Sequence, residues 1–187
     1  EQWLEESRMS VPKDAVCRLY EGLVSFPDES GFDLLTALAA LYQGANRNEE
    51  AVEVLTDAAR RVTDDGQRLQ IVAGMASELS AIDLQVQALE QAYRNDAKYF
   101  EDLEAGLTQA GRYKKLVQTL VNRAQVLELE GSLEPSQRLL ERAAHLAQSE
   151  LDDGEWALEL LEKAAGLTKN VEDLETAFNL AFEREDL

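Results

Sequence analysis

Few residues of this chain have the types and spacing that catalysis requires. His145 is the only histidine and Cys17 the only cysteine among 187 residues. A lone histidine in a helical stretch is more often a surface or groove residue than a proton shuttle. A single cysteine forms neither an intrachain disulfide nor a zinc cluster. The serines, histidine and aspartates match no known nucleophile motif, and there is no glycine-rich phosphate loop. We therefore expect no enzyme within these residues and no cofactor.

Two acidic loops, TDDG at 63–66 and DDGE at 152–155, raise the question of a metal site. Both lack the alternating oxygen ligands and the final glutamate of a calcium loop. Aspartate just before a helix instead accepts hydrogen bonds from the free N–H groups of the first turn. We interpret both loops as helix caps and predict no metal. Carboxylates such as Glu128 and Glu159 occupy helical positions that we expect to be solvated, without the burial that a general acid or base needs.

The composition narrows the class of partner. The chain carries 37 acidic and 18 basic side chains, a formal net charge of -19, and 45% of its residues are hydrophobic. Such a surface repels phosphate backbones and anionic lipid headgroups, and no apolar run approaches the ~20 residues of a membrane helix. We expect a protein or peptide partner that is basic or neutral, with no nucleic acid and no membrane. The cluster Arg112, Lys114 and Lys115 is interpreted as a solvated loop.

The first residues carry neither the basic region nor the apolar core of a signal peptide. This feature and the lone Cys17 favour a cytoplasmic location. Because the sequence begins without methionine, we expect a segment of a longer protein, in which an upstream export signal stays an open alternative.

The elements that would position these side chains are helices. Alanine, leucine, glutamate and glutamine dominate, β-branched residues are sparse, and no stretch has the period-2 pattern of a strand. Short polar breaks leave ten expected helices, at 12–25, 32–44, 48–61, 66–79, 82–94, 97–110, 113–130, 134–150, 154–167 and 170–184. Loops this short allow only antiparallel neighbours, so the sequence predicts an all-α chain of helical hairpins.

The first two complete hairpins repeat each other. On the first helix, Leu35, Leu38, Ala39 and Tyr42 return at the same spacing as Leu69, Val72, Ala73 and Ala76. On the second helix, Ala51, Leu55 and Ala58 return with the same offset as Gln85, Leu89 and Ala92. A preserved period of about 34 residues in a helix-turn-helix unit is typical of a repeat protein.

This pattern resembles the tetratricopeptide repeat (TPR), which has a bulky residue, leucine, a small residue and tyrosine on its first helix. The resemblance implies a right-handed superhelix of TPR-like antiparallel hairpins, running as one segment through residues 1–187. Its parts would be the second helix of a partial repeat at 12–27, repeats at 32–63 and 66–96, degenerate repeats at 97–130 and 134–167, and a terminal or capping helix at 170–187. In the third unit, either Glu104 or Leu107 would occupy the small position.

The resemblance also implies a non-enzymatic scaffold that binds a peptide or protein. In the family, the groove contacts come from the first helix of each hairpin, between its packing residues. Carried over to this sequence, they are Thr36, Ala40, Gln43, Gln70, Gly74, Ser77, Glu101, Ala105, Thr108, Glu141, His145 and Gln148. Exposed tryptophans, Trp3 or Trp156, are alternative anchors. Two further alternatives stay open: an architectural or oligomerisation arm that binds its own copies, and a regulatory docking domain of an enzyme that lies outside this segment.

Overall fold

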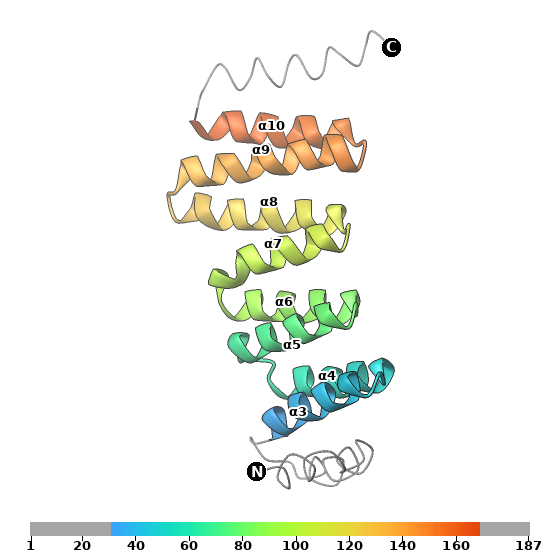
Figure 1. Ribbon diagram of the computed structural model, residues 1–187. Helices are drawn as coiled ribbons and strands as arrows, with labels where there is room; N and C mark the ends of the chain where they lie inside the picture. Colours follow the sequence, from blue (N-terminus) through green and yellow to red (C-terminus); the bar gives the residue numbers. More distant parts are fainter. Residues whose placement is uncertain (1–30, 169–187) are drawn as a thin grey trace, which may run out of the picture. The chain divides into compact units, whose positions relative to one another are not determined.

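The computed structural model describes residues 31–168, which contain eight α-helices, one 3-10 turn and no strand (Figure 1). The elements are α3 (Gly31–Gly44), α4 (Asn48–Arg61), α5 (Gly66–Glu78), α6 (Ile82–Asn95), η1 (Ala97–Tyr99), α7 (Phe100–Gln109), α8 (Tyr113–Leu129), α9 (Leu133–Glu150) and α10 (Gly154–Thr168). All eight helices predicted within this part are present, and their ends differ from the prediction by at most three residues. The predicted helices 12–25 and 170–184 lie outside the described residues, as do Trp3 and Cys17.

The largest difference from the prediction is at the start of the helix expected at 97–110. Ala97–Tyr99 form the 3-10 turn η1, and the α-helix begins only at Phe100. The Asp96 side chain accepts a hydrogen bond from the backbone N–H of Lys98, two residues further on, at 2.9 Å. A bond over so short a separation favours a tighter first turn than the α-helix has.

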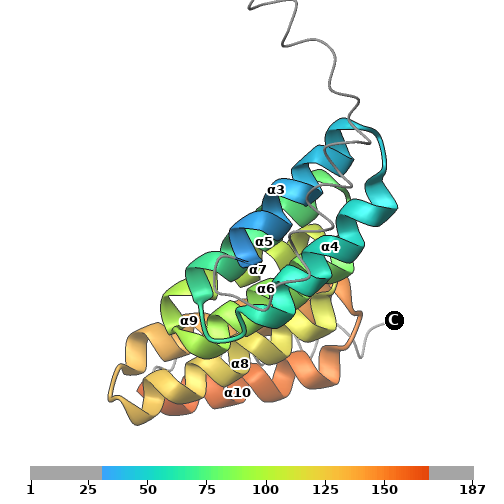
Figure 2. The ribbon, with the colours of Figure 1, turned by 90° about the horizontal axis from the view of Figure 1, so that it is seen from below.

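The helices group into two compact units that divide after Gly106, within α7. In the first unit, α3 packs against α4 and α5 against α6 as antiparallel hairpins (Figure 1). Viewed along the stack, α3 and α5 lie in one layer and α4 and α6 in a second (Figure 2). In the second unit, α9 packs against both α8 and α10. The expected all-α, TPR-like hairpin fold is therefore confirmed.

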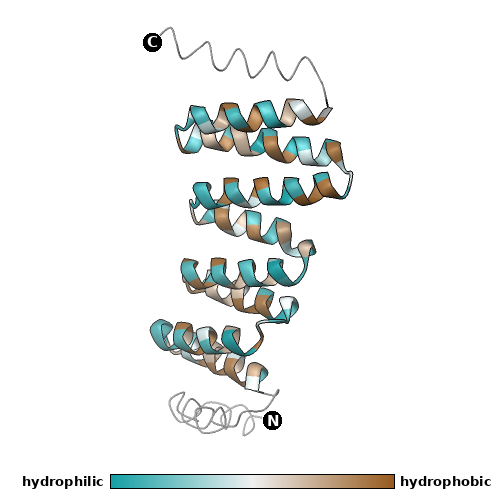
Figure 3. Ribbon diagram, turned by 180° about the vertical axis from the view of Figure 1, so that it is seen from behind, coloured by the Kyte–Doolittle hydropathy of each residue, from teal (hydrophilic) through white to brown (hydrophobic). Residues whose placement is uncertain are grey.

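Small residues lie where the helices of the first unit meet. Ala39, Ala51 and Ala58 have no exposed surface, and every packing residue of the two matching hairpins is buried. Alanine at these positions lets two helix backbones approach closely, while leucines such as Leu35 and Leu55 fill the space between them. Hydrophobic and hydrophilic segments alternate along every described helix (Figure 3), as amphipathic packing requires.

The third hairpin follows the second at a shorter spacing than the second follows the first. α5 begins at Gly66 and η1 at Ala97, and α6 begins at Ile82 and α8 at Tyr113. Both steps have the same length, and both are shorter than the steps from α3 to α5 and from α4 to α6. At this spacing Glu104 corresponds to Ala73 and therefore occupies the small position, where it is 9% exposed.

The second unit has a polar link in its core. The fully buried Ser136, on α9, donates a hydrogen bond from its hydroxyl to the carbonyl of Ala124, on α8, at 2.8 Å. Alanines again form the packing surface, with Ala143, Ala144 and Ala147 on α9 all buried. The packing rule of the first hairpins thus continues in these longer helices.

Candidate interaction site

The first helices of the hairpins, α3, α5 and α7, share an exposed stripe of small residues. Ala40, Gly74 and Ala105 occupy corresponding positions on these helices, and all three are exposed. A Cβ atom added to Gly74 would meet nothing within 4 Å, so there is open space above the middle of α5. We call the surface around these three residues the first-helix face.

Polar side chains link neighbouring first helices beside this stripe. The amide of Gln43, on α3, donates to Glu78 Oε2, on α5, at 3.3 Å. The amide of Gln70, on α5, donates to Asp102 Oδ2, on α7, at 2.8 Å. In both pairs an amide N–H is the donor and a carboxylate the acceptor, so each pair still presents carboxylate and amide oxygens to a ligand. We refer to them as the amide–carboxylate pairs.

Eight of the twelve predicted groove residues lie on the first helices of the first unit. Ala40, Gln70, Gly74, Glu101 and Ala105 are exposed, and Thr36, Gln43 and Ser77 are half-buried. The Thr36 hydroxyl lies within hydrogen-bond distance of the carbonyls of Phe32, at 3.2 Å, and Asp33, at 3.1 Å, in its own helix. The hydroxyl donor of Thr36 is therefore used within its own helix.

The other four predicted residues lie in the second unit. Thr108, near the end of α7, and His145, on α9, are exposed. Glu141 and Gln148 are half-buried on α9, and Glu141 Oε1 accepts a hydrogen bond from the Gln137 amide at 2.7 Å. Glu141, His145 and Gln148 are spaced four and three apart, so they share one face of that helix.

Ile71, which was not among the residues predicted from the sequence, is 48% exposed on α5. It is three residues from Gly74 and therefore lies on the same side of the helix. In the sequence, Ile71 stands next to the buried apolar residue Val72 and two positions after buried Leu69. An apolar residue in such a run is expected to be buried, so the sequence did not indicate that Ile71 is exposed. Trp156, one of the two alternative anchors, is half-buried.

The charge on the first helices of the first unit is almost entirely negative. Their acidic residues are Asp33, Glu78, Glu101, Asp102 and Glu104. The only basic residue in α3, α5 or the first seven residues of α7 is Arg68, which pairs with Asp65 at 3.5 Å. The first-helix face is therefore rich in hydrogen-bond acceptors and poor in charged donors.

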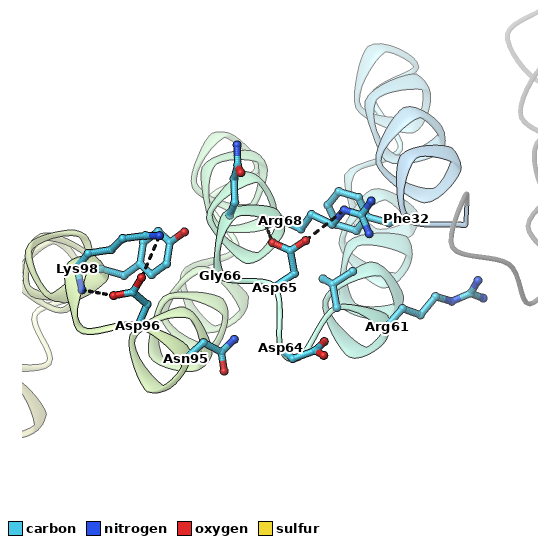
Figure 4. Close-up of a pocket in the computed structure, with 12 residues that line it drawn as sticks. Phe32, Arg61, Asp64, Asp65, Gly66, Arg68, Asn95, Asp96 and Lys98 are labelled. Atoms are coloured by element: carbon cyan, nitrogen blue, oxygen red, sulfur yellow. Dashed lines mark hydrogen bonds and ion pairs between the residues drawn. The ribbon is translucent and has the colours of Figure 1, made fainter.

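A hollow of about 1100 Å³ lies at the hairpin junctions of the first unit, beside the starts of α5 and η1 (Figure 4). Asp65 caps α5 by accepting a hydrogen bond from the backbone N–H of Arg68 at 3.0 Å, and the Arg68 guanidinium lies over the Phe32 ring.

The second acidic loop also caps a helix. Asp153 accepts a hydrogen bond from the backbone N–H of Trp156 at 3.0 Å, at the start of α10. The predicted capping role of the two acidic loops is confirmed at these residues.

The second junction in the hollow repeats this arrangement. Lys98 pairs with Asp96 at 3.0 Å and lies over the Tyr99 ring. Hydrogen bonds from the Lys98 backbone and ammonium groups lower the pKa of the Asp96 carboxyl, and the bond with Asp96 raises the pKa of Lys98. The side-chain amides of Gln91 and Asn95 both donate to the carbonyl of Thr63, at 2.8 Å. Since these groups mainly bond one another, we assign the hollow a structural role.

Neither of two other kinds of site is found in the part of the chain that the structure describes. Among residues 31–168, no three histidine, cysteine, aspartate or glutamate side chains are grouped so that they could hold a metal ion. Over the same residues, no helix combines the length and the apolar character needed to cross a membrane.

The sequence matches no protein-family model and no curated protein. Among solved structures, the chain is similar to MamA, with 15% identity, a TM-score of 0.40 and coverage of 88% of this chain and 87% of that one. It is also similar to a kinesin light chain protein of Podosopora anserina with nearly identical TPR-like repeats, at 20% identity, a TM-score of 0.43 and coverage of 83% and 86%. Because these similarities are distant, the fold assignment depends on the arrangement of this chain's own helices.

Proposed function

We propose that this chain is a non-enzymatic protein-interaction module that binds a peptide or protein segment on its first-helix face. The observation that carries the proposal is the exposed stripe Ala40, Gly74 and Ala105. Arrays of helical hairpins offer extended surfaces for protein partners, and small residues let a partner backbone approach the helices closely. Hydrogen-bonding groups beside the stripe and exposed Ile71 provide polar and apolar contacts within the same surface.

The charge of the surface defines the partner further. The chain as a whole has a net charge of -19, and Arg68 is the only basic residue on the first helices of the first unit. A basic or neutral partner avoids repulsion, and basic side chains accelerate encounter at low salt. The partner-binding residues are the eight predicted groove residues of the first unit together with Ile71. Thr108, Glu141, His145 and Gln148 lie in the second unit and are proposed as partner-binding residues of that unit by itself.

The test is a selection of random peptides on the full 187-residue chain, followed by affinity measurements for the tightest binder. A Cβ atom at Gly74 meets nothing within 4 Å, so Gly74→Arg places a long side chain in the open space above α5, and it should weaken binding at least tenfold. Gly166→Arg is a matched control, because Gly166 is an exposed helical glycine on α10 whose added Cβ would also meet nothing within 4 Å. Equal affinity for wild type and Gly74→Arg would refute binding at this face.

The same preparation distinguishes the proposal from the alternative of a self-associating arm. Analytical ultracentrifugation of the chain should show a mass that does not change with concentration. If no peptide is selected and the mass rises with concentration, the chain binds its own copies and the proposed function is wrong.

A further inference from the structure

We propose that α5 is the centre of a docking strip for an extended segment with two basic side chains four residues apart and an apolar side chain midway between them. The strip consists of the Gln43–Glu78 pair, Ile71, Gly74 and the Gln70–Asp102 pair. This inference rests on the proposed function and specifies its partner.

The two amide–carboxylate pairs are the sites for the basic side chains. Each carboxylate has two oxygens with about four acceptor directions, of which the glutamine amide uses one, and the glutamine carbonyl adds a further acceptor. An arginine or lysine can therefore form charge-assisted hydrogen bonds at each pair. Arg68, the one basic residue of these helices, pairs with Asp65, so it does not compete for either site.

The four-residue spacing of the two basic side chains follows from the geometry of α5. Gln70 and Glu78 are eight residues apart on this helix, which corresponds to about 12 Å along its axis. The Gln43–Glu78 pair lies on the α3 side of α5 and the Gln70–Asp102 pair on its α7 side. The two pairs are therefore also separated by about one interhelical distance, ~8–10 Å, perpendicular to the helix axis. The diagonal between them is thus roughly 15 Å. An extended chain rises about 3.3 Å per residue, so residues i and i+4 are ~13 Å apart, and long basic side chains reach the rest of the way.

The middle of the diagonal crosses α5 at Gly74, next to the apolar residue of the strip, Ile71. In an extended chain, residues i, i+2 and i+4 point to the same side. Residue i+2 therefore faces α5 near Gly74, which is four residues from both Gln70 and Glu78 and has open space above it. Ile71, 48% exposed, lies three residues before Gly74 and is its neighbour on the helix surface. An apolar side chain at i+2 would cover Ile71, and it has room to do so because Gly74 has no side chain.

The occupant lies outside these 187 residues, and we assign it to a partner protein. Within the sequence, two basic residues are separated by four positions only at Arg94 and Lys98 and at Arg138 and Arg142. The midpoint of the first is Asp96, which is not apolar, and the midpoint of the second is Leu140, which is fully buried within α9. A folded second copy of this chain therefore offers no segment of the required pattern.

The test compares two blocked seven-residue peptides of identical composition on the full chain by isothermal titration calorimetry. The first has arginine at positions 2 and 6, leucine at 4 and serine at 3 and 5, with glycine at both ends. The second has its two arginines adjacent. We expect the spaced peptide to bind at least fivefold more tightly, because only it can reach both pairs while leucine covers Ile71.

Two double variants with the same change in charge locate the binding site. Glu78→Gln with Asp102→Asn should weaken the spaced peptide at least tenfold. Glu53→Gln with Asp57→Asn, on exposed positions of α4 in the other layer, should change its affinity less than twofold. No preference for the spaced peptide, no binding of either peptide, or an equal loss in both double variants would overturn the inference.

The experiments distinguish an error in the docking-strip proposal from an error in the proposed function. If peptides selected on the full chain lose affinity with Gly74→Arg but show no spaced basic pattern, the first-helix face binds segments of another kind. If Gly74→Arg leaves every selected peptide unaffected, the proposed function itself is wrong.

Discussion

Two glycines at the start and middle of α5 have opposite roles. Gly66 is covered by the Tyr99 ring, so that a Cβ atom there would collide with Cε2 and come within 3.0 Å of Cζ. Tyr99 is only 7% exposed, and its ring is part of the junction between the hairpins. Gly74 lies in the helix interior with open space above it, which makes it accessible to a partner but gives it no packing role.

This contrast predicts stability changes of opposite sign. Gly66→Ala should lower the free energy of unfolding by about 1–3 kcal/mol, because the Tyr99 ring must move out of a packed position. Gly74→Ala should raise it by ~0.5–1 kcal/mol, since alanine loses less backbone entropy than glycine in a helix. Urea melts of both variants and the wild type measure the two effects. Changes of the same sign would show that one of the two environments is described incorrectly.

At the scale of helices, the sequence was sufficient to locate every element between residues 31 and 168 except the turn η1. The recurrence of packing residues such as Ala39 and Ala73 depends only on helix periodicity and burial, both of which are visible in sequence. The 3-10 turn η1 was not predicted, because it depends on one hydrogen bond from Lys98 to Asp96.

The candidate site was predictable only in part. Helix periodicity was enough to choose exposed first-helix positions such as Ala40 and Gly74. The Gln43–Glu78 and Gln70–Asp102 pairs join residues 35 and 32 positions apart, and no sequence pattern determines whether two such side chains meet. The exposure of Ile71 likewise depends on how α5 is oriented between its neighbours.

The packing of the helices gives a test of the assigned faces. Ala39 and Ala58 are fully buried at helix contacts, so Ala39→Leu or Ala58→Leu should destabilise the protein by about 1–3 kcal/mol through overpacking. Thr36→Leu, at a half-buried position beside the first-helix face, should be close to neutral. Urea denaturation of the three variants provides the comparison. If all three variants lose the same free energy of unfolding, the faces assigned to packing and to the surface are wrong.

For the whole molecule, charge and fold point to the same kind of function. The net charge of -19 disfavours polyanionic partners, while the hairpins of the first unit present a layer of first helices with little positive charge. The central claim is therefore that a partner segment binds on the first-helix face and not on the layer of second helices.

The chain has only two isoleucines, Ile71 and Ile82, which makes a direct measurement of this claim simple. Ile71 is 48% exposed on the first-helix face, whereas Ile82 is 42% exposed at the start of α6 in the other layer. Labelling the isoleucine δ1-methyl groups of the full chain gives an NMR spectrum with one signal for each. On titration with the tightest selected peptide, the Ile71 signal should shift progressively while the Ile82 signal stays in place. A shift confined to Ile82, or saturable binding that moves neither signal, would contradict the account.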